Sequence, residues 1–440
     1  MENLSTKNTF ELLKKQILAT KSKEDEEKPK KHLRVEQHVI KPEHPYFSLF
    51  ADFTHRSKNL YNHANYLVRQ EFINNGKWLR YQDLDELLKK DLEYPDYKDM
   101  GIVQCAQQTL RIVDSNWKSF FKAIKDWKEN KSKYTGRPKL PKYKKKDGLF
   151  EYVITNQNAV LKGDVIQFPK CFGKITIKPL FVEYENFKSF QQLRIIPRNN
   201  TFVLEFVYEI KPAEEKADNH RYLGVDLGID NLVAVSTSEG KAFLVNGKGL
   251  KAKNKYYNKL VGHYKSVEMM MNNSYSSKRL QKIHTKRNHI MNDFMHKTSR
   301  YIVDFALENE INTIIIGNNK GWKQESNLGV VTNQTFTQIP HKRLIERIQY
   351  KAKTVGIRVI VVNEAYTSGT SFLDDEKPTK KFYDKTRRKH RGLFISNEGK
   401  KINADINASL QIIKKFVKGF SAKDVSFKNN LLFNPLVVNF

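Results

Sequence analysis

Cysteine is almost absent from this sequence, and long apolar runs are lacking. Only Cys105 and Cys171 occur among 440 residues, far apart along the chain. Two cysteines exclude a cysteine-rich zinc site and argue against a disulfide framework, so we expect an intracellular protein. The apolar runs are as short as Ile314–Ile316, and no signal-peptide pattern precedes the first charged residues. We therefore expect neither a membrane span nor secretion.

Acidic residues are the minority charge. The chain has 48 Asp and Glu against 78 Lys and Arg, which gives a formal net charge of +30 and a pI near 9.7. Such an excess indicates a polyanionic partner. Nucleic acid fits best, because Phe, Tyr and Trp make up 12% of the residues and offer stacking surfaces. A membrane-surface protein would need a strongly amphipathic basic helix, and the sequence has no clear example.

The chain is too long for one compact core, and its hydrophobic pattern changes along its length. A mixed-charge tail, 1–32, precedes an alternating strand pattern in 33–45. Helical spacing then occupies 46–135, and short strands with period-two alternation dominate 136–217. Because the strand near Leu33 belongs with these later strands, the helices between them are interpreted as an insertion.

Two segments predict basic surfaces. Gly136–Lys146 holds six basic residues beside a tyrosine, and its two prolines prevent a helix. One interpretation is that this segment binds a phosphodiester backbone. The other is that it is a solvated basic loop. A predicted helix, 276–307, has further cations on or near one side. The candidate contacts in these segments are Arg137, Lys139, Lys142, Tyr143, Lys144, Lys282, Lys286 and Arg287.

A carboxylate ends a short apolar strand in Tyr222–Asp230. An unpaired buried charge is costly, so Asp226 is explained well if a divalent metal neutralises it. The other interpretation is a surface Asp at a strand-to-turn boundary, where Asp is common. Asp405 lies in the first turn of a predicted helix, 403–417, where it either binds metal or only offsets the helix dipole.

The order of the predicted elements from residue 221 onward favours metal binding. Three antiparallel strands, with Asp226 on the first, precede alternating helices and strands and a last helix with Asp405. This is the element order of an RNase H-like fold, which gathers carboxylates around two divalent ions about 3.5–4 Å apart. One ion activates water, and the other stabilises the leaving oxygen of a phosphodiester.

On these motifs the chain resembles the TnpB family, transposon-encoded RNA-guided nucleases related to type V CRISPR effectors and to Fanzor proteins. The matching pieces run almost from end to end: Tyr61-Asn62, Arg69, Gln108–Phe121, Gly136–Lys146, Gly224–Gly228, Gly317–Gln324, Tyr366–Ser368, Arg391-Gly392 and Asn403–Asn407. The resemblance implies a multidomain α+β protein with a β-barrel-like wedge module, a helical recognition insertion and an RNase H-like (RuvC) α/β nuclease domain. It also implies a guide RNA encoded near the gene, a double-stranded DNA target and a site of action at the nucleoid in a prokaryotic cytoplasm.

One departure from the family concerns catalysis. The strand that ends at Gly317 carries the middle catalytic glutamate in most relatives, and here Gly317 is followed by Asn318 and Asn319. Either catalysis is lost or the carboxylate has moved. Glu364 ends the neighbouring parallel strand about 4.8 Å away, and a glutamate is long enough to reach back across that gap. We therefore expect Asp226, Glu364 and Asp405 to hold two Mg²⁺, for which Mn²⁺ can substitute.

A second departure concerns the family's zinc loop, which usually contains two Cys pairs. The corresponding segment, 366–394, has no cysteine, so we expect it to fold without structural zinc. The resemblance makes it a target-strand loading segment, and we expect its arginines to contact DNA. The candidate contacts in the C-terminal half are Lys320, Trp322, Lys323, Arg387, Arg388 and Arg391.

The sequence therefore predicts an RNA-guided, metal-dependent DNA endonuclease that cuts beside a short target-adjacent motif. The predicted nuclease domain comprises 218–365 and 395–424, and 425–440 is predicted as a C-terminal tail. Two alternatives stay open. One is a catalytically inactive RNA-guided DNA-binding protein, such as a repressor, and the other is a guide-independent resolvase or transposase. The oligomeric state is not predicted.

Overall fold

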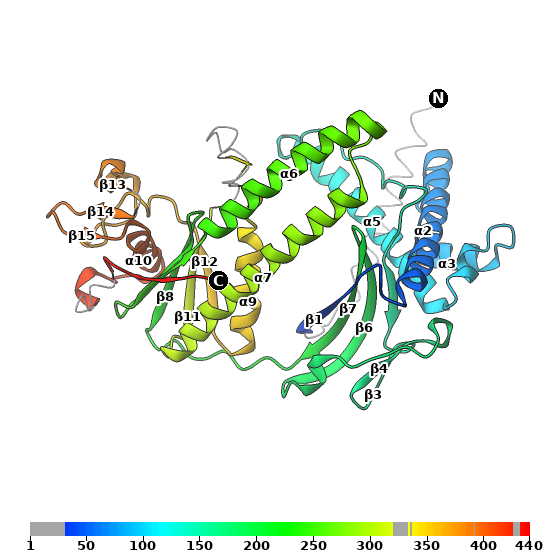
Figure 1. The fold of residues 1–440 in the computed structure, drawn as a ribbon, viewed down its shortest axis with the longest axis horizontal. Helices are drawn as coiled ribbons and strands as arrows, with labels where there is room; N and C mark the ends of the chain where they lie inside the picture. Colours follow the sequence, from blue (N-terminus) through cyan, green and yellow to red (C-terminus); the bar gives the residue numbers. More distant parts are fainter. Residues whose placement is uncertain (1–30, 320–332, 335–336, 391, 426–431) are drawn as a thin grey trace, which may run out of the picture.

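The computed structural model describes residues 31–319, 333–334, 337–390, 392–425 and 432–440. Two sheets organise these residues, one in each half of the chain (Figure 1). Helices α6 (Lys248–Asn272) and α7 (Lys278–Glu308) form a long hairpin that runs diagonally between the halves. None of the described helices combines the length and the apolar composition that crossing a membrane requires.

The N-terminal sheet has four antiparallel strands in the order β1-β7-β6-β2. Strand β1 pairs with β7 from Leu33–Glu209 to Ile40–Phe202, so the strand near Leu33 does belong with the later strands, as the sequence predicts. A separate three-stranded sheet lies beside it. The bounds are β1 Leu33–Ile40, β2 Tyr152–Thr155, β3 Val160–Lys162, β4 Val165–Gln167, β5 Thr176–Ile177, β6 Phe187–Arg198 and β7 Thr201–Ile210.

Between β1 and β2 the chain is helical, with α2 (Phe47–Asn75), α3 (Tyr81–Lys90), α4 (Asp96–Asp99) and α5 (Val103–Glu129). Helix α2 ends at Gly76, whose φ of 66° is the left-handed conformation that glycine adopts easily. The apolar stripe of α5 packs on α2, with Trp117 fully buried and its Nε1 atom donating to Asn65 Oδ1 at 2.9 Å. The stripe is core, as its helical spacing predicts.

The C-terminal sheet has six strands in the order β12-β11-β8-β9-β10-β16. Strands β8, β11 and β12 are parallel, and β9 is antiparallel to β8 and β10. The bounds are β8 Tyr222–Leu227, β9 Asn231–Thr237, β10 Ala242–Asn246, β11 Thr313–Gly317, β12 Arg358–Val362 and β16 Leu436–Val438. Strand β16 pairs in parallel with β10, so the end of the predicted tail 425–440 is part of this sheet.

Helices cover both faces of this sheet. Leu223 and Val225 of β8 pack with residues of α7 and α9 (His341–Thr354), whereas Tyr222 packs with α10 (Ala404–Phe416). Successive side chains of a strand point to opposite faces, so Asp226 lies on the same face as Tyr222, toward α10. Gly224 lies on that face too, and a Cβ there would overlap the backbone of α10 at Ser409. The glycine thus lets α10 approach β8 closely.

Three short strands complete the described structure: β13 (Arg388–His390), β14 (Leu393–Ile395) and β15 (Lys401–Ile402) form a small sheet before α10. The two halves of the chain meet where Arg34 of β1 reaches α9. Its guanidinium lies 4.3 Å from the centroid of the Tyr350 ring and donates to the Tyr350 carbonyl and the Thr354 hydroxyl.

Candidate active site and nucleic-acid surfaces

The three predicted carboxylates come from three elements that meet at one edge of the C-terminal sheet. Asp226 is near the end of β8, and Glu364 follows β12. Asp405 is in the first turn of α10, which begins after Asn403. The Asn403 side chain accepts from the backbone N–H groups of Asp405 and Ile406 at 3.0 and 3.2 Å. This N-cap fixes the start of the helix and thereby the place of Asp405.

Gly317 lies between the strands that carry Asp226 and Glu364. Its neighbour Ile316 pairs with Val225 of β8, and Gly317 itself pairs with Val362 of β12. A Cβ at Gly317 would lie 2.9 Å from Glu364 Oε2 and 3.1 Å from Glu364 Cβ. The Glu364 side chain therefore folds back over the glycine, into the space that a side chain on β11 would need. The absence of a side chain at Gly317 creates the room for Glu364.

Lys415 of α10 holds the backbone on both sides of Glu364. Its ammonium donates to the carbonyl oxygens of Asn363 at 2.8 Å and Ala365 at 2.5 Å. Burial raises the pKa of Glu364 to about 7, and the positive charge of Lys415 opposes that rise. The Glu364 Oε2 atom is buried and has no hydrogen-bond partner among the residues that the structure describes, so one carboxylate oxygen is available to a ligand there.

Glu364 and Asp405 both act on Asp226. Burial raises the pKa of Asp226 well above its usual range, and the negative charges of Glu364 and Asp405 raise it further, against the opposing charge of Arg388. Like charges at one site favour protonated carboxyls until a cation neutralises them. Close carboxylates with a raised pKa are typical of a functional site.

Both oxygens of Asp405 already have donors. Arg388 Nη2 donates to Asp405 Oδ1 at 2.6 Å, and Asn231 Nδ2 donates to Oδ2 at 2.8 Å. As the side chains stand, no group of three His, Cys, Asp or Glu within the described residues is arranged to hold a metal ion. The donor set nevertheless fits Mg²⁺ chemically, because it consists of carboxylate oxygens and includes the unpartnered Glu364 Oε2. Asn231 was not among the site residues predicted from the sequence. Its position only five residues after Asp226 was the signal that could have placed it near the carboxylates.

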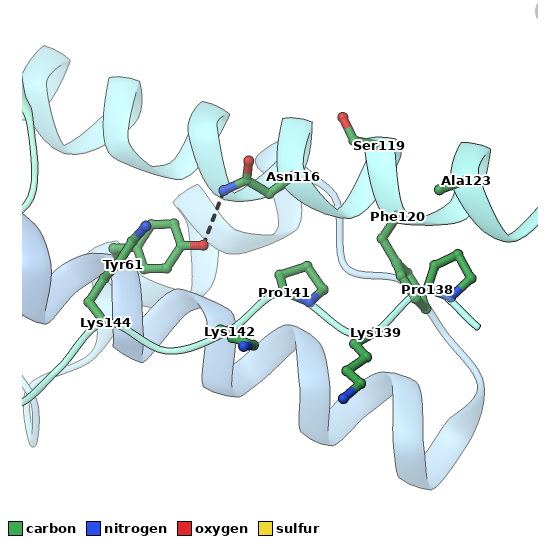
Figure 2. Close-up of a pocket in the computed structure, with 10 residues that line it drawn as sticks. All are labelled: Tyr61, Asn116, Ser119, Phe120, Ala123, Pro138, Lys139, Pro141, Lys142 and Lys144. Atoms are coloured by element: carbon green, nitrogen blue, oxygen red, sulfur yellow. Dashed lines mark hydrogen bonds between the residues drawn. The ribbon is translucent and has the colours of Figure 1, made fainter. Parts of the chain in front are cut away.

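The basic segment Gly136–Lys146 lines a groove of about 410 Å³ against α2 and α5 (Figure 2). Lys139 and Lys142 are exposed beside it. The Tyr61 hydroxyl accepts from Asn116 Nδ2 at 3.1 Å, and the Lys144 ammonium lies 4.6 Å from the centroid of the Tyr61 ring. The Tyr61 ring is only 2% exposed, so the groove offers cations that suit a phosphate backbone and no free ring of Tyr61 for base stacking.

The other predicted contacts in the N-terminal segment and on α7 have mixed environments. Arg137 is exposed, and Tyr143 is exposed with the Arg69 guanidinium 4.8 Å from the centroid of its ring. Lys282 and Lys286 are exposed and line a groove of about 340 Å³ between α7 and the β1 and β7 ends. Arg287 is partly buried and donates to Asn254 and to the Gln338 carbonyl, so it helps to hold α7 against its neighbours.

The structure corrects one predicted DNA contact in the loading segment. Arg387 is only 8% exposed, and its guanidinium forms two hydrogen bonds to Glu376 at 2.8 and 2.9 Å. A buried guanidinium with these partners is structural and is not free to bind a phosphate. Arg388 is exposed and reaches Asp405. Lys320, Trp322, Lys323 and Arg391 lie outside the described residues.

Two family models match the chain. One, described as a probable transposase (OrfB_IS605), covers residues 205–323, and the other, the TNB domain of Cas12f1-like proteins, covers residues 341–412. These matches lie on the half of the chain that contains Asp226, Glu364 and Asp405.

Individual relatives agree with the family models. The TnpB-like protein ORF457 of Acidianus two-tailed virus is 24% identical over 82% of this chain and 82% of its own length. The CRISPR-associated endodeoxyribonuclease Cas12f1 of Sulfoacidibacillus thermotolerans is 25% identical over 48% of this chain and 50% of its own length. Among solved structures, the mini RNA-guided endonuclease CRISPR-Cas_phi3 aligns with 12% identity and a TM-score of 0.45, covering 94% of this chain and 97% of that chain.

Proposed function

We propose that this chain, whose resemblance to the TnpB family the matches confirm, is an RNA-guided DNA endonuclease. The observation that carries the proposal is Glu364, whose side chain lies over Gly317 at the sheet edge where Asp226 and Asp405 also lie. A chain that had lost catalysis through the Gly317 change would have no reason to keep a buried glutamate folded into that space. The strand order of the C-terminal sheet supports an RNase H-like (RuvC) assignment for this half.

Asp226, Glu364 and Asp405 would hold two divalent ions, Mg²⁺ or Mn²⁺. When bound, such ions activate water and stabilise the leaving oxygen in phosphodiester hydrolysis. The role of the surrounding protein is to hold the three carboxylates in fixed positions. Lys415 fixes the backbone around Glu364, and Asn403 fixes the start of the helix that carries Asp405. Because burial favours the protonated form of Glu364, this carboxyl must lose its proton before it can serve as a ligand.

The basic surfaces support a nucleic-acid partner. We propose that the groove along Gly136–Lys146 and the exposed lysines of α7 bind the backbones of a guide RNA and a double-stranded DNA target. Guide pairing would select the sequence, while the protein would read a short target-adjacent motif and the shape of the heteroduplex. The predicted division into a wedge module, 33–45 with 136–217, and a recognition insertion, 46–135, belongs to this proposal.

The test is cleavage by the full chain, purified together with RNA transcribed from the DNA that flanks its gene. A double-stranded DNA library with one matching target and randomised neighbouring bases is offered with Mg²⁺ or Mn²⁺. The proposal expects cuts that depend on the match, on a short adjacent motif and on the metal. Guided binding without cutting would contradict the nuclease and support the inactive DNA-binding alternative. Cutting without RNA would instead indicate a guide-independent resolvase or transposase.

A further inference from the structure

Arg387 anchors the segment between β12 and α10. Besides its two hydrogen bonds to Glu376, its guanidinium donates to the carbonyl oxygens of Phe382 at 2.7 Å and Gly369 at 3.0 Å. The Asp374 carboxylate lies 3.7 Å away. A buried arginine with a bidentate carboxylate and two carbonyl acceptors has little freedom to move. Arg387 therefore sets where the backbone of the next residue lies.

Arg388 is that next residue and the first of β13, where its backbone pairs with Phe394 of β14. Arg387 is the last residue of a short 3-10 helix, 385–387, and the chain becomes extended at Arg388, so the two neighbouring side chains have different partners. Arg388 reaches Asp405 Oδ1 with its Nη2 atom at 2.6 Å. The Arg388 side chain is 37% exposed and the Asp405 side chain 20%, so the pair lies at the mouth of the site.

Asn231 occupies the other Asp405 oxygen from the first position of β9. A neutral amide can share a carboxylate with a metal ion, because it adds no charge. A guanidinium is different: its full positive charge would lie a few ångströms from a divalent cation bound to the same carboxylate. Arg388 and a metal ion therefore disfavour each other at Asp405 Oδ1, whereas Asn231, which donates to Oδ2, adds no such repulsion.

We propose that Arg388 competes with divalent ions for Asp405. In the metal-free chain it neutralises and holds the carboxylate, and metal binding releases it. The freed guanidinium, still placed by Arg387 at the mouth of the site, is then available to a phosphate of the DNA. Metal binding and DNA binding would in this way favour each other. The inference rests on the proposed function, since it assumes that Asp405 is a metal ligand.

The experiment is a Mn²⁺ titration of the full chain without nucleic acid, followed by electron paramagnetic resonance. Binding that disappears in the Asp226→Asn variant counts as binding at the site. Arg388→Ala and Arg388→Gln should both tighten this Mn²⁺ binding by about twofold to fivefold, the value of a partly exposed ion pair. Lys389→Ala, which removes one positive charge at the next position of β13, should leave the affinity near that of the wild type.

Three outcomes would overturn the inference. If both Arg388 variants bind Mn²⁺ with wild-type affinity, the arginine does not compete with the ion. If they bind it more weakly, Arg388 orients Asp405 for the metal instead of masking it. If Lys389→Ala tightens binding as much, the effect is one of net charge. If no variant shows Asp226-dependent Mn²⁺ binding, the proposed nuclease function fails too. If such binding is present but insensitive to Arg388, only the inference about Arg388 fails.

Discussion

Strand β11 and the segment 366–394 both lack side chains that the family resemblance leads one to expect, and different groups lie at the two places. At β11 the missing group is a carboxylate, and Glu364 on the adjacent strand occupies the space over Gly317. In the segment 366–394 the missing groups are cysteines, and Arg387 with Glu376 and Asp374 forms a buried ion cluster. A catalytic group must stay at one point in space, so the replacement that we propose, Glu364, comes from a neighbouring strand. A structural centre only has to hold a loop together, so different chemistry can replace it.

The ion cluster should show the largest effect on stability. Arg387→Met leaves Glu376 and Asp374 without their buried partner, and breaking a buried pair from one side costs about 3–5 kcal/mol. We expect hydrogen exchange to lose protection across the segment 366–394. The conservative Arg387→Lys should recover part of it, because the charge stays but the bidentate contact does not. Lys385→Met, at an exposed neighbour, is the control. Unchanged protection in Arg387→Met would mean that the cluster does not hold the segment.

Adding a single methyl group at Gly317 should disturb the carboxylates at the sheet edge. A Cβ at Gly317 would lie 2.5 Å from Ile412 Cδ1 and 2.9 Å from Glu364 Oε2, so Gly317→Ala must displace the carboxylate. We expect guided DNA cleavage to fall by about 10²-fold, the size of a lost transition-state contact, while guided DNA binding is retained. Gly262→Ala is a matched control, because no atom lies within 4 Å of the added Cβ. Full cleavage by Gly317→Ala would contradict the placement of Glu364.

Glu364 should contribute a loss of stability to the metal-free chain as pH rises, opposite in sign to the contribution of His296, whose pKa is lowered to about 4 chiefly by burial. The pKa of Glu364 is about 7 in the folded chain against an ordinary value of 4.5, so the folded state holds a proton that the unfolded state has released. Between these values, raising the pH therefore destabilises the fold, and the raised pKa of Asp226 acts in the same direction. Thermal unfolding in a chelator from pH 5 to 8 measures this, and Glu364→Gln should show a shallower decline. Glu346→Gln, an exposed glutamate, should decline like the wild type.

Lys415 should have the smallest effect. Its charge opposes the rise in the pKa of Glu364, so Lys415→Met should raise that pKa further. Cleavage should then reach half of its maximum at a higher pH, with a loss of about twofold to tenfold at pH 7, since one pKa unit corresponds to a factor of ten. Lys418→Met, just beyond α10 and exposed, should keep the wild-type profile. A fall in rate with an unmoved pH profile would assign Lys415 to backbone support alone.

Sequence patterns predicted the elements that build the C-terminal sheet and the three carboxylates at its edge. Period-two alternation and parallel strand ends predicted that Glu364 ends the strand beside β11, and the family resemblance supplied the reason to expect a displaced carboxylate there. The surroundings of individual arginine side chains could not be predicted in this way. Arg387 and Arg388 are adjacent residues of the same type, yet Arg387 is buried against Glu376 and Arg388 reaches Asp405. That difference depends on tertiary partners, as does the pairing of β16 with β10.

The central claim is that Glu364 replaces the missing carboxylate of β11, and the most direct test is guided DNA cleavage by Glu364→Gln at saturating Mg²⁺. We expect a loss of about 10²- to 10³-fold, similar to that of Asp226→Asn, with guided DNA binding unchanged and Glu346→Gln fully active. Wild-type cleavage by Glu364→Gln, together with an inactive Asp226→Asn, would contradict it.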